Sequence, residues 1–113
     1  MGSRTNFTFI TADGALTLYS HFGGESKFQD LAHALERAQA RRGDTSYELR
    51  IIISQLIGQD WDSETGFGLF IGTQGGEESY ETCTVFLERD MVVRGTGSSL
   101  SIQDFIDSQK VKV

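Results

Sequence analysis

The chain has a single cysteine and no proline. One thiol can form no disulfide within the chain and cannot build a thiolate zinc cage, so a reducing compartment such as the cytoplasm is expected. No apolar run approaches the roughly 20 residues that a membrane-spanning helix needs, and no signal-peptide pattern opens the chain. The sequence therefore predicts neither a membrane anchor nor export.

Basic residues are also scarce, since ten Lys and Arg stand against sixteen Asp and Glu and give a formal net charge of −6. Nucleic-acid binding depends on clustered Lys and Arg, so no nucleic-acid partner is expected. Eight acidic residues and one basic residue lie between Gln59 and Asp90, whereas four arginines cluster earlier, between Arg37 and Arg50. Such a two-signed surface is typical of solvated faces, and its acidic part can also attract a basic partner.

Length and apolar content favour one domain over residues 1–113, with a cloning remnant or flexible start at 1–5 and a tail at 109–113. Only 38% of the residues are apolar, and eight of them are phenylalanines. A compact fold must bury nearly every aromatic side chain that it has. Few are then left for function.

The stretch NFTFITADGALTLYSHF predicts a β-hairpin, because two strand-like runs flank an Asp13-Gly14 turn signal. A type I′ turn at that dipeptide pairs Phe7 with Ser20. Alternation along the strands then places Ser20 on the core face with the phenylalanines. It places Tyr19 and His21 on the opposite, half-polar face, which is free to contact a partner.

Two helices and a second group of strands follow. Capping-box pairs begin the helices at Ser26 with Gln29, at Thr45 with Glu48, and at Ser101 with Asp104. On the second helix, Tyr47 and Ile51 lie away from the apolar stripe. The runs FGLFIGT, YETCTVFLE and MVVRG predict a three-stranded meander. The order ββααβββα indicates an α+β fold, with a mainly antiparallel sheet of about five strands packed on two to three helices.

Catalysis is not expected at the Tyr19, Ser20, His21 triplet. Along a strand Ser20 faces away from its two neighbours, and His33 is the only other histidine. Gly23 and the glycine after it let the chain turn from strand to helix. A small hydrolase that uses His21 is kept as the third alternative, and no catalytic residue is assigned.

No metal or cofactor is expected either. Asp60, Asp62 and Glu64 alternate as in calcium loops, but the glycine comes one place late and Ile71 stands where the closing glutamate belongs. These residues are therefore read as an acidic surface loop. Cys83 has no basic neighbour in sequence, which favours a buried and inert thiol.

The stretches LYSHFGGE and GDTSYELRIIISQLIGQDWDSETGFG resemble a family of small, mostly uncharacterised proteins encoded by bacteriophages of actinobacteria. The resemblance extends to residue 72 and rests on these stretches rather than on a catalytic motif. It implies action inside an infected bacterium, on a host or defence protein. It carries no functional residue across.

These observations lead to two main hypotheses. The first is a non-enzymatic phage accessory protein that binds a host or defence macromolecule in the host cytoplasm, with Tyr19, His21, Tyr47 and Ile51 as contacts. The second is a protein that sequesters a nucleotide-like ligand, with Tyr19 stacking, His21 and Arg50 pairing charge, and Gly95, Gly97 and Ser98 holding phosphate. A homodimer is compatible with both, because a small sheet leaves free edges.

Overall fold

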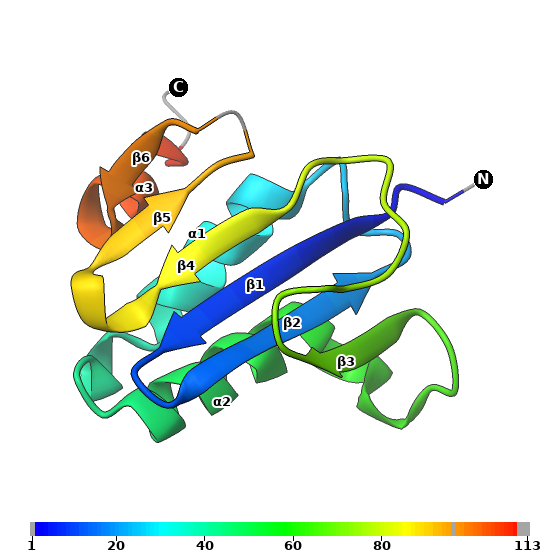
Figure 1. The fold of residues 1–113 in the computed structure, drawn as a ribbon, viewed down its shortest axis with the longest axis horizontal. Helices are drawn as coiled ribbons and strands as arrows, with labels where there is room; N and C mark the ends of the chain where they lie inside the picture. The colour runs from blue at the N-terminus through cyan, green and yellow to red at the C-terminus, as the bar shows by residue number, and fades with distance from the viewer. Residues whose placement is uncertain (1, 96, 111–113) are drawn as a thin grey trace.

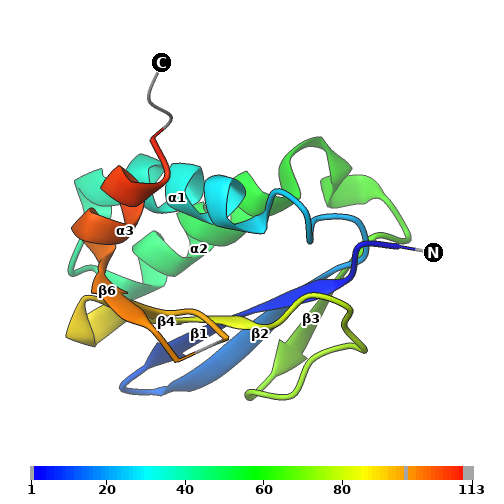
Figure 2. The same cartoon turned by 90° about the horizontal axis from the view of Figure 1, so that it is seen from above.

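The computed structural model describes residues 2–95 and 97–110, which fold into two layers with the α-helices on one face of a single sheet (Figures 1 and 2). The strands are β1 (Thr5–Thr11), β2 (Gly14–Ser20), β3 (Phe67–Ile71), β4 (Cys83–Phe86), β5 (Met91–Val93) and β6 (Ser99–Ser101). The helices are α1 (Lys27–Arg37), α2 (Thr45–Ile57) and α3 (Ile102–Ser108), with short 3₁₀ helices η1 (Gln39–Arg41), η2 (Gly58–Asp62) and η3 (Leu87–Arg89). The predicted α+β class and element order are confirmed. The described part of the sheet has six strands, one more than expected.

The strands lie in the order β3-β2-β1-β4-β5-β6, and every neighbouring pair is antiparallel except β1 with β4. The predicted meander is therefore wrong, because β3 joins β2 while β4 joins the other side of the hairpin. Both flanks of the hairpin are thereby paired, so neither of its strands forms an edge of the sheet. The extra strand β6 comes from a segment expected to be a connection. It forms because Leu100 pairs with Val92 and packs against the core.

The β1–β2 hairpin differs from its predicted register by two residues. Phe7 pairs with Leu18, and the turn closes at Thr11 and Gly14 instead of one step later. The Thr11 hydroxyl explains the choice, because it accepts from the Asp13 N–H at 3.1 Å and donates to the Gly14 carbonyl at 3.1 Å. A shift by two leaves each side chain on its predicted face. Phe7 and Leu18 are accordingly buried in the core.

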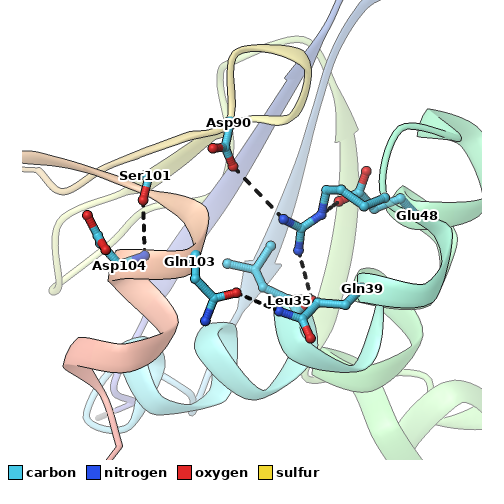
Figure 3. Close-up of polar contacts among 8 residues, drawn as sticks. Leu35, Gln39, Glu48, Asp90, Ser101, Gln103 and Asp104 are labelled. Carbon is cyan, nitrogen blue, oxygen red and sulfur yellow. Dashed lines mark hydrogen bonds and ion pairs between the residues drawn. The ribbon is translucent and has the colours of Figure 1, made fainter.

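The core lies between the sheet and the helices. Its fully buried large side chains include Phe9, Leu18, Leu31, Leu35, Ile52, Val85, Val92, Ile102, Phe105 and Ile106. The apolar stripe predicted for α2 supplies Ile52, Ile53 and Ile57. Glu48 of the same helix is also buried, and its Oε2 lies 2.7 Å from Arg42 Nε (Figure 3). Tertiary packing thus draws one carboxylate of α2 into the interior.

The connection between β3 and β4, residues 72–82, crosses the outer face of β2 and β1 (Figure 1). The Thr17 hydroxyl donates to the Gly72 carbonyl at 2.8 Å, and the Asn6 amide donates to the Gly76 carbonyl at 2.9 Å and accepts from the Gly76 N–H at 3.0 Å. Asn6 is only 3% exposed as a result. The prediction of a wet, half-polar face is therefore wrong for this part of the hairpin, because the connection supplies the polar partners that water was expected to supply.

Of the three predicted helix starts, only the one at Ser101 makes a side-chain cap bond. The Asp104 N–H donates to Ser101 Oγ at 3.0 Å (Figure 3). The Ser26 hydroxyl instead donates to the Asp30 carboxylate at 2.7 Å, and no side chain caps α2. The buried Glu48 carboxylate bonds to Arg42 and to the backbone of Gly43 instead of to Thr45.

Replacing Ser101 with alanine should lower the free energy of unfolding by about 1 kcal/mol, because the Asp104 N–H loses its partner. The same change at Thr45 should cost less than about 0.5 kcal/mol, since its side chain makes no cap bond and only an exposed hydrogen bond to Glu88 Oε2 at 3.2 Å. Urea denaturation of the two variants beside the parent measures both values. Equal losses would contradict the difference that the structure shows.

Both ends of the described chain are held by contacts. The Ser3 carbonyl accepts from the Gly24 N–H at 2.7 Å and the Arg4 carbonyl accepts from the Ser79 N–H at 2.9 Å, so the segment expected as a flexible start is tied to the fold from Ser3 onward. Lys110 lies 3.2 Å from Glu36, and the rest of the predicted tail, 111–113, lies outside the described residues. None of the helices in the described ranges has the length and apolar character needed to cross a bilayer.

Candidate functional site

A cavity of about 410 Å³ opens between the sheet and the helices, at the end where β1 begins and β2 ends. Phe7 and Ser20 of the hairpin, Leu56 of α2 and Phe67 of β3 line it. The connections from β2 to α1 and from α2 to β3 close its sides. Segments that are far apart in sequence therefore meet at one hollow.

The buried wall of this cavity carries a hydroxyl. Ser20 is 3% exposed, and its Oγ makes no hydrogen bond with any residue that the structure describes. A Cβ built on Gly23 would lie 2.5 Å from that oxygen. Gly23 therefore leaves room beside the hydroxyl that no other residue type would leave.

The rim of the cavity is acidic. Asp30 and Asp60 line it with exposed carboxylates, and the Ser26 hydroxyl donates to Asp30 at 2.7 Å. Ser63 donates to the carbonyl of Thr65 at 2.9 Å and so shapes the loop before β3. No lysine, arginine or histidine is among the described residues that line the cavity. The site consequently offers hydrogen-bond acceptors without a positive charge.

Tyr19 and His21 lie on the other side of β2. The Tyr19 hydroxyl and His21 Nδ1 are 2.8 Å apart, and the His21 N–H donates to the Gly66 carbonyl at 2.8 Å. Both side chains are half-buried, beside the connection that holds Gly76. The prediction that Ser20 faces away from both is confirmed, since Ser20 is on the core face. Tyr19 and His21 thus form a pair that does not include the serine.

Tyr47 and Ile51, the other two predicted contacts, belong to the helix layer. Tyr47 is exposed and the Arg41 guanidinium lies 4.5 Å from the centroid of its ring, whereas Ile51 is half-buried against the core. Tyr19 lies on the opposite layer, on the sheet's outer face. The structure therefore does not bring the four predicted contacts onto one surface.

The residues predicted to hold a nucleotide-like ligand are also dispersed. Gly95, Gly97 and Ser98 form the turn between β5 and β6, closed by the Arg94 N–H donating to the Ser98 carbonyl at 2.9 Å. β5 is separated from β2, which carries Tyr19, by two strands, and Arg50 is exposed on α2. These residues form no single phosphate site.

The strand β3 lies at one end of the sheet and has a free edge. Ile71 is 93% exposed and Leu69 is 52% exposed, and Phe70 and Trp61 of η2 are exposed beside them. The Gly72 N–H and the Gly66 carbonyl bond to the β2 side. By alternation, the N–H and carbonyl groups of Leu69 and Ile71 point away from β2 toward the open edge. Sequence reasoning identified this strand but not its position at an edge.

The part of the chain that the structure describes holds neither a candidate metal centre nor a reactive thiol. The described residues contain no group of three or more His, Cys, Asp or Glu side chains placed to hold a metal ion, and Asp60, Asp62 and Glu64 are exposed. Cys83 is fully buried, and desolvation raises its pKa to about 11. The thiol is therefore protonated at neutral pH, as its sequence context predicted.

Sequence reasoning missed the cavity, although one signal for it was present. A serine on the core face of a strand, among phenylalanine and leucine, needs a polar partner or an opening beside it.

Comparisons of the chain with protein-family models, with curated proteins and with solved structures find no match.

Proposed function

We propose that the chain is a non-enzymatic accessory protein of an actinobacterial bacteriophage, acting in the host cytoplasm by binding a host or defence protein. The observation that carries the proposal is the open edge of β3. Leu69 and Ile71 are exposed there, and their backbone groups are unpaired by any described residue. An edge of this kind is suited to accept a strand from another protein.

The composition of β3 supports this reading. Edge strands are usually shielded by lysine, proline or a bulge, because an open ladder recruits other chains. Phe67–Ile71 contains no charged residue and no proline, and it pairs with β2 without a bulge. A strand left so open in a protein of high negative charge is favoured as a contact surface over a solvated one.

The charges around the edge favour a basic partner. Asp60 lines a hollow together with Leu69 of β3, and Asp62 and Glu64 follow Asp60 in the segment that leads into the strand. A second copy of the chain would bring the same acidic flanks into contact and would be repelled. An extended apolar segment flanked by lysine or arginine would be attracted. The partner is therefore proposed to be such a segment.

Adding a charge at the edge should abolish capture. Immobilised parent chain is expected to retain a protein from lysate of an actinobacterial host, and the double variant Leu69→Lys with Ile71→Lys should lose it. Both positions are exposed, so the fold should be kept. With the retained protein purified, titration calorimetry should show at least about tenfold weaker binding, or 1.4 kcal/mol.

Tyr47→Ala is the matched control, because Tyr47 is equally exposed but lies in the helix layer. It should change the affinity by less than about threefold. Loss of binding in Tyr47→Ala with retention in the β3 variant would move the contact to α2. Sedimentation of the free chain separates the remaining alternative, since a dimer disrupted by the β3 variant would identify a second copy as the occupant.

A further inference from the structure

We infer that the cavity beside Ser20 binds an organic cation, namely a primary ammonium or guanidinium group on a short apolar stem. This inference concerns a cavity that adjoins the β3 edge at Phe67 and Asp60, and it does not depend on the proposed function. It rests on the donors and acceptors of the cavity, on its buried hydroxyl and on its aromatic walls.

The polar lining selects a ligand that donates hydrogen bonds. Ionised Asp30 and Asp60 can only accept, and the hydroxyls of Ser20 and Ser63 can accept as well. The described lining has no side-chain N–H and no positive charge. A phosphate or carboxylate would meet like charge here, whereas a cation would meet two carboxylates. Anionic ligands are thereby disfavoured.

The buried hydroxyl indicates where the ligand would reach. Ser20 is more than nine-tenths buried, and its Oγ has no partner among the residues that the structure describes. The oxygen atom itself is not among the fully buried unpartnered side-chain atoms of the described residues, so it can be reached from the cavity and can accept a hydrogen bond from a ligand. The space that Gly23 leaves beside Oγ lets a donor approach from the cavity.

Aromatic rings supply the second half of the recognition. Phe7 and Phe67 form apolar walls for a stem, and Phe22 stands at the rim with 74% of its surface exposed. The His21 ring packs edge-on against Phe22, with the centroids 4.6 Å apart. A cation at the rim can lie over the face of such a ring. The volume of about 410 Å³ is in the range of small-ligand sites.

The test is a titration of the full chain at pH 7, followed by amide NMR. The probe is n-butylammonium, with 1-butanol as the neutral analogue and butyrate as the anionic one. Butylammonium is expected to shift the amides of Ser20, Gly23 and Gly66 and to bind at least about tenfold more tightly than 1-butanol. Equal binding of 1-butanol, preference for butyrate, or shifts confined to other residues would overturn the inference.

Variants separate a built site from general charge attraction. Asp30→Asn together with Asp60→Asn should weaken butylammonium binding at least about tenfold, and Gly23→Ala should abolish the shifts at Ser20. Glu77→Gln removes an exposed carboxylate that does not line the cavity and should change binding less than about twofold. An equal loss per removed carboxylate in the aspartate double variant and in Glu77→Gln would assign the effect to net charge and overturn the site.

Two further probes distinguish the sources of such a cation. Tighter binding of spermidine than of butylammonium would identify a free polyamine as the ligand. Tighter binding of Nα-acetyl-lysine N-methylamide would identify a lysine side chain of another protein. Failure of both to compete with butylammonium would overturn the inference, because neither source would then fit the cavity. Ile71→Lys alone, at a residue that does not line the cavity, should change these affinities by less than about twofold, so this result is independent of the partner-binding experiment.

Discussion

Replacing Arg42 with alanine is expected to lower the free energy of unfolding by about 3 kcal/mol at pH 7. Glu48 is 1% exposed, and Arg42 Nε lies 2.7 Å from its Oε2 (Figure 3). Removing the guanidinium leaves a buried carboxylate without its positive partner. The negative charge of Asp90 then repels it without compensation. Urea denaturation at pH 7 measures the loss. A loss below about 1 kcal/mol would show that water reaches Glu48.

The loss in the free energy of unfolding of the Arg42→Ala variant, its stability deficit, should also depend on pH. Desolvation raises the pKa of Glu48, and Arg42 opposes that rise. Because the native pKa lies above the unfolded value of about 4.3, the native state binds the proton more tightly. Stability from this group is fully present below the unfolded pKa and is lost as the pH rises through the native pKa. Without Arg42 the native pKa rises further, so the deficit of the Arg42→Ala variant should be smaller at pH 4.5 than at pH 7.

A matched double variant isolates the carboxylate. Adding Glu48→Gln to Arg42→Ala should remove the pH-dependent part of the deficit and recover part of the stability at pH 7, because a neutral amide costs less to bury than an unpaired charge. Identical deficits at pH 4.5 and pH 7 in the single variant would contradict the assignment to Glu48.

Replacing Gly75 with alanine is expected to cost about 3 kcal/mol. A Cβ at this position would lie 2.7 Å from Asn6 Cγ and 2.8 Å from Thr17 Cγ2. Overpacking of this kind costs about 1 to 3 kcal/mol, and displacing Asn6 also loosens its two hydrogen bonds to Gly76. Urea denaturation gives the total loss. Hydrogen exchange at the amide of Gly76 reports whether the connection has lifted from β1.

The neighbouring residue provides the control. Gln74 is exposed, so Gln74→Ala should change the stability by less than about 0.5 kcal/mol. Parent-like stability of Gly75→Ala would mean that the connection over the hairpin packs more loosely than these contacts indicate. If Gly75→Ala removes the hydrogen-exchange protection of Gly76 but hardly changes the free energy of unfolding, the connection unfolds as a separate, less stable unit.

The parts of the fold that could be predicted from sequence are those encoded locally. The apolar stripe of α2 and the cap at Ser101 depend on residues within a few positions of one another, and both were identified. The register of the hairpin was missed because the Thr11 hydroxyl outweighed the Asp13-Gly14 signal. The edge position of β3 was missed because strand partners far apart in sequence leave no local pattern.

The candidate site was predictable in the same partial way. The face of Ser20 followed from alternation alone, and so did its separation from His21. The cavity did not, because its acidic rim joins Asp30 of α1 to Asp60 of η2, which are far apart in sequence. Tyr19 was expected at an open surface, but the chain after β3 lies beside it. Such long-range coverings depend on tertiary packing rather than on residue pattern.

The position of β1 in the middle of the sheet affects how the chain folds during synthesis on the ribosome. β2 is synthesised directly after β1, but the other neighbour of β1, β4, is synthesised only after α1, α2 and β3. Until β4 pairs with β1, the hairpin keeps one unpaired strand edge. Its outer face is also uncovered until residues 72–82 cross it. The late pairing of β1 with β4, which closes the long segment between them, slows folding. It also lengthens the time in which nascent chains can aggregate. Demand for a chaperone should therefore be greatest just before Cys83–Phe86 leaves the exit tunnel.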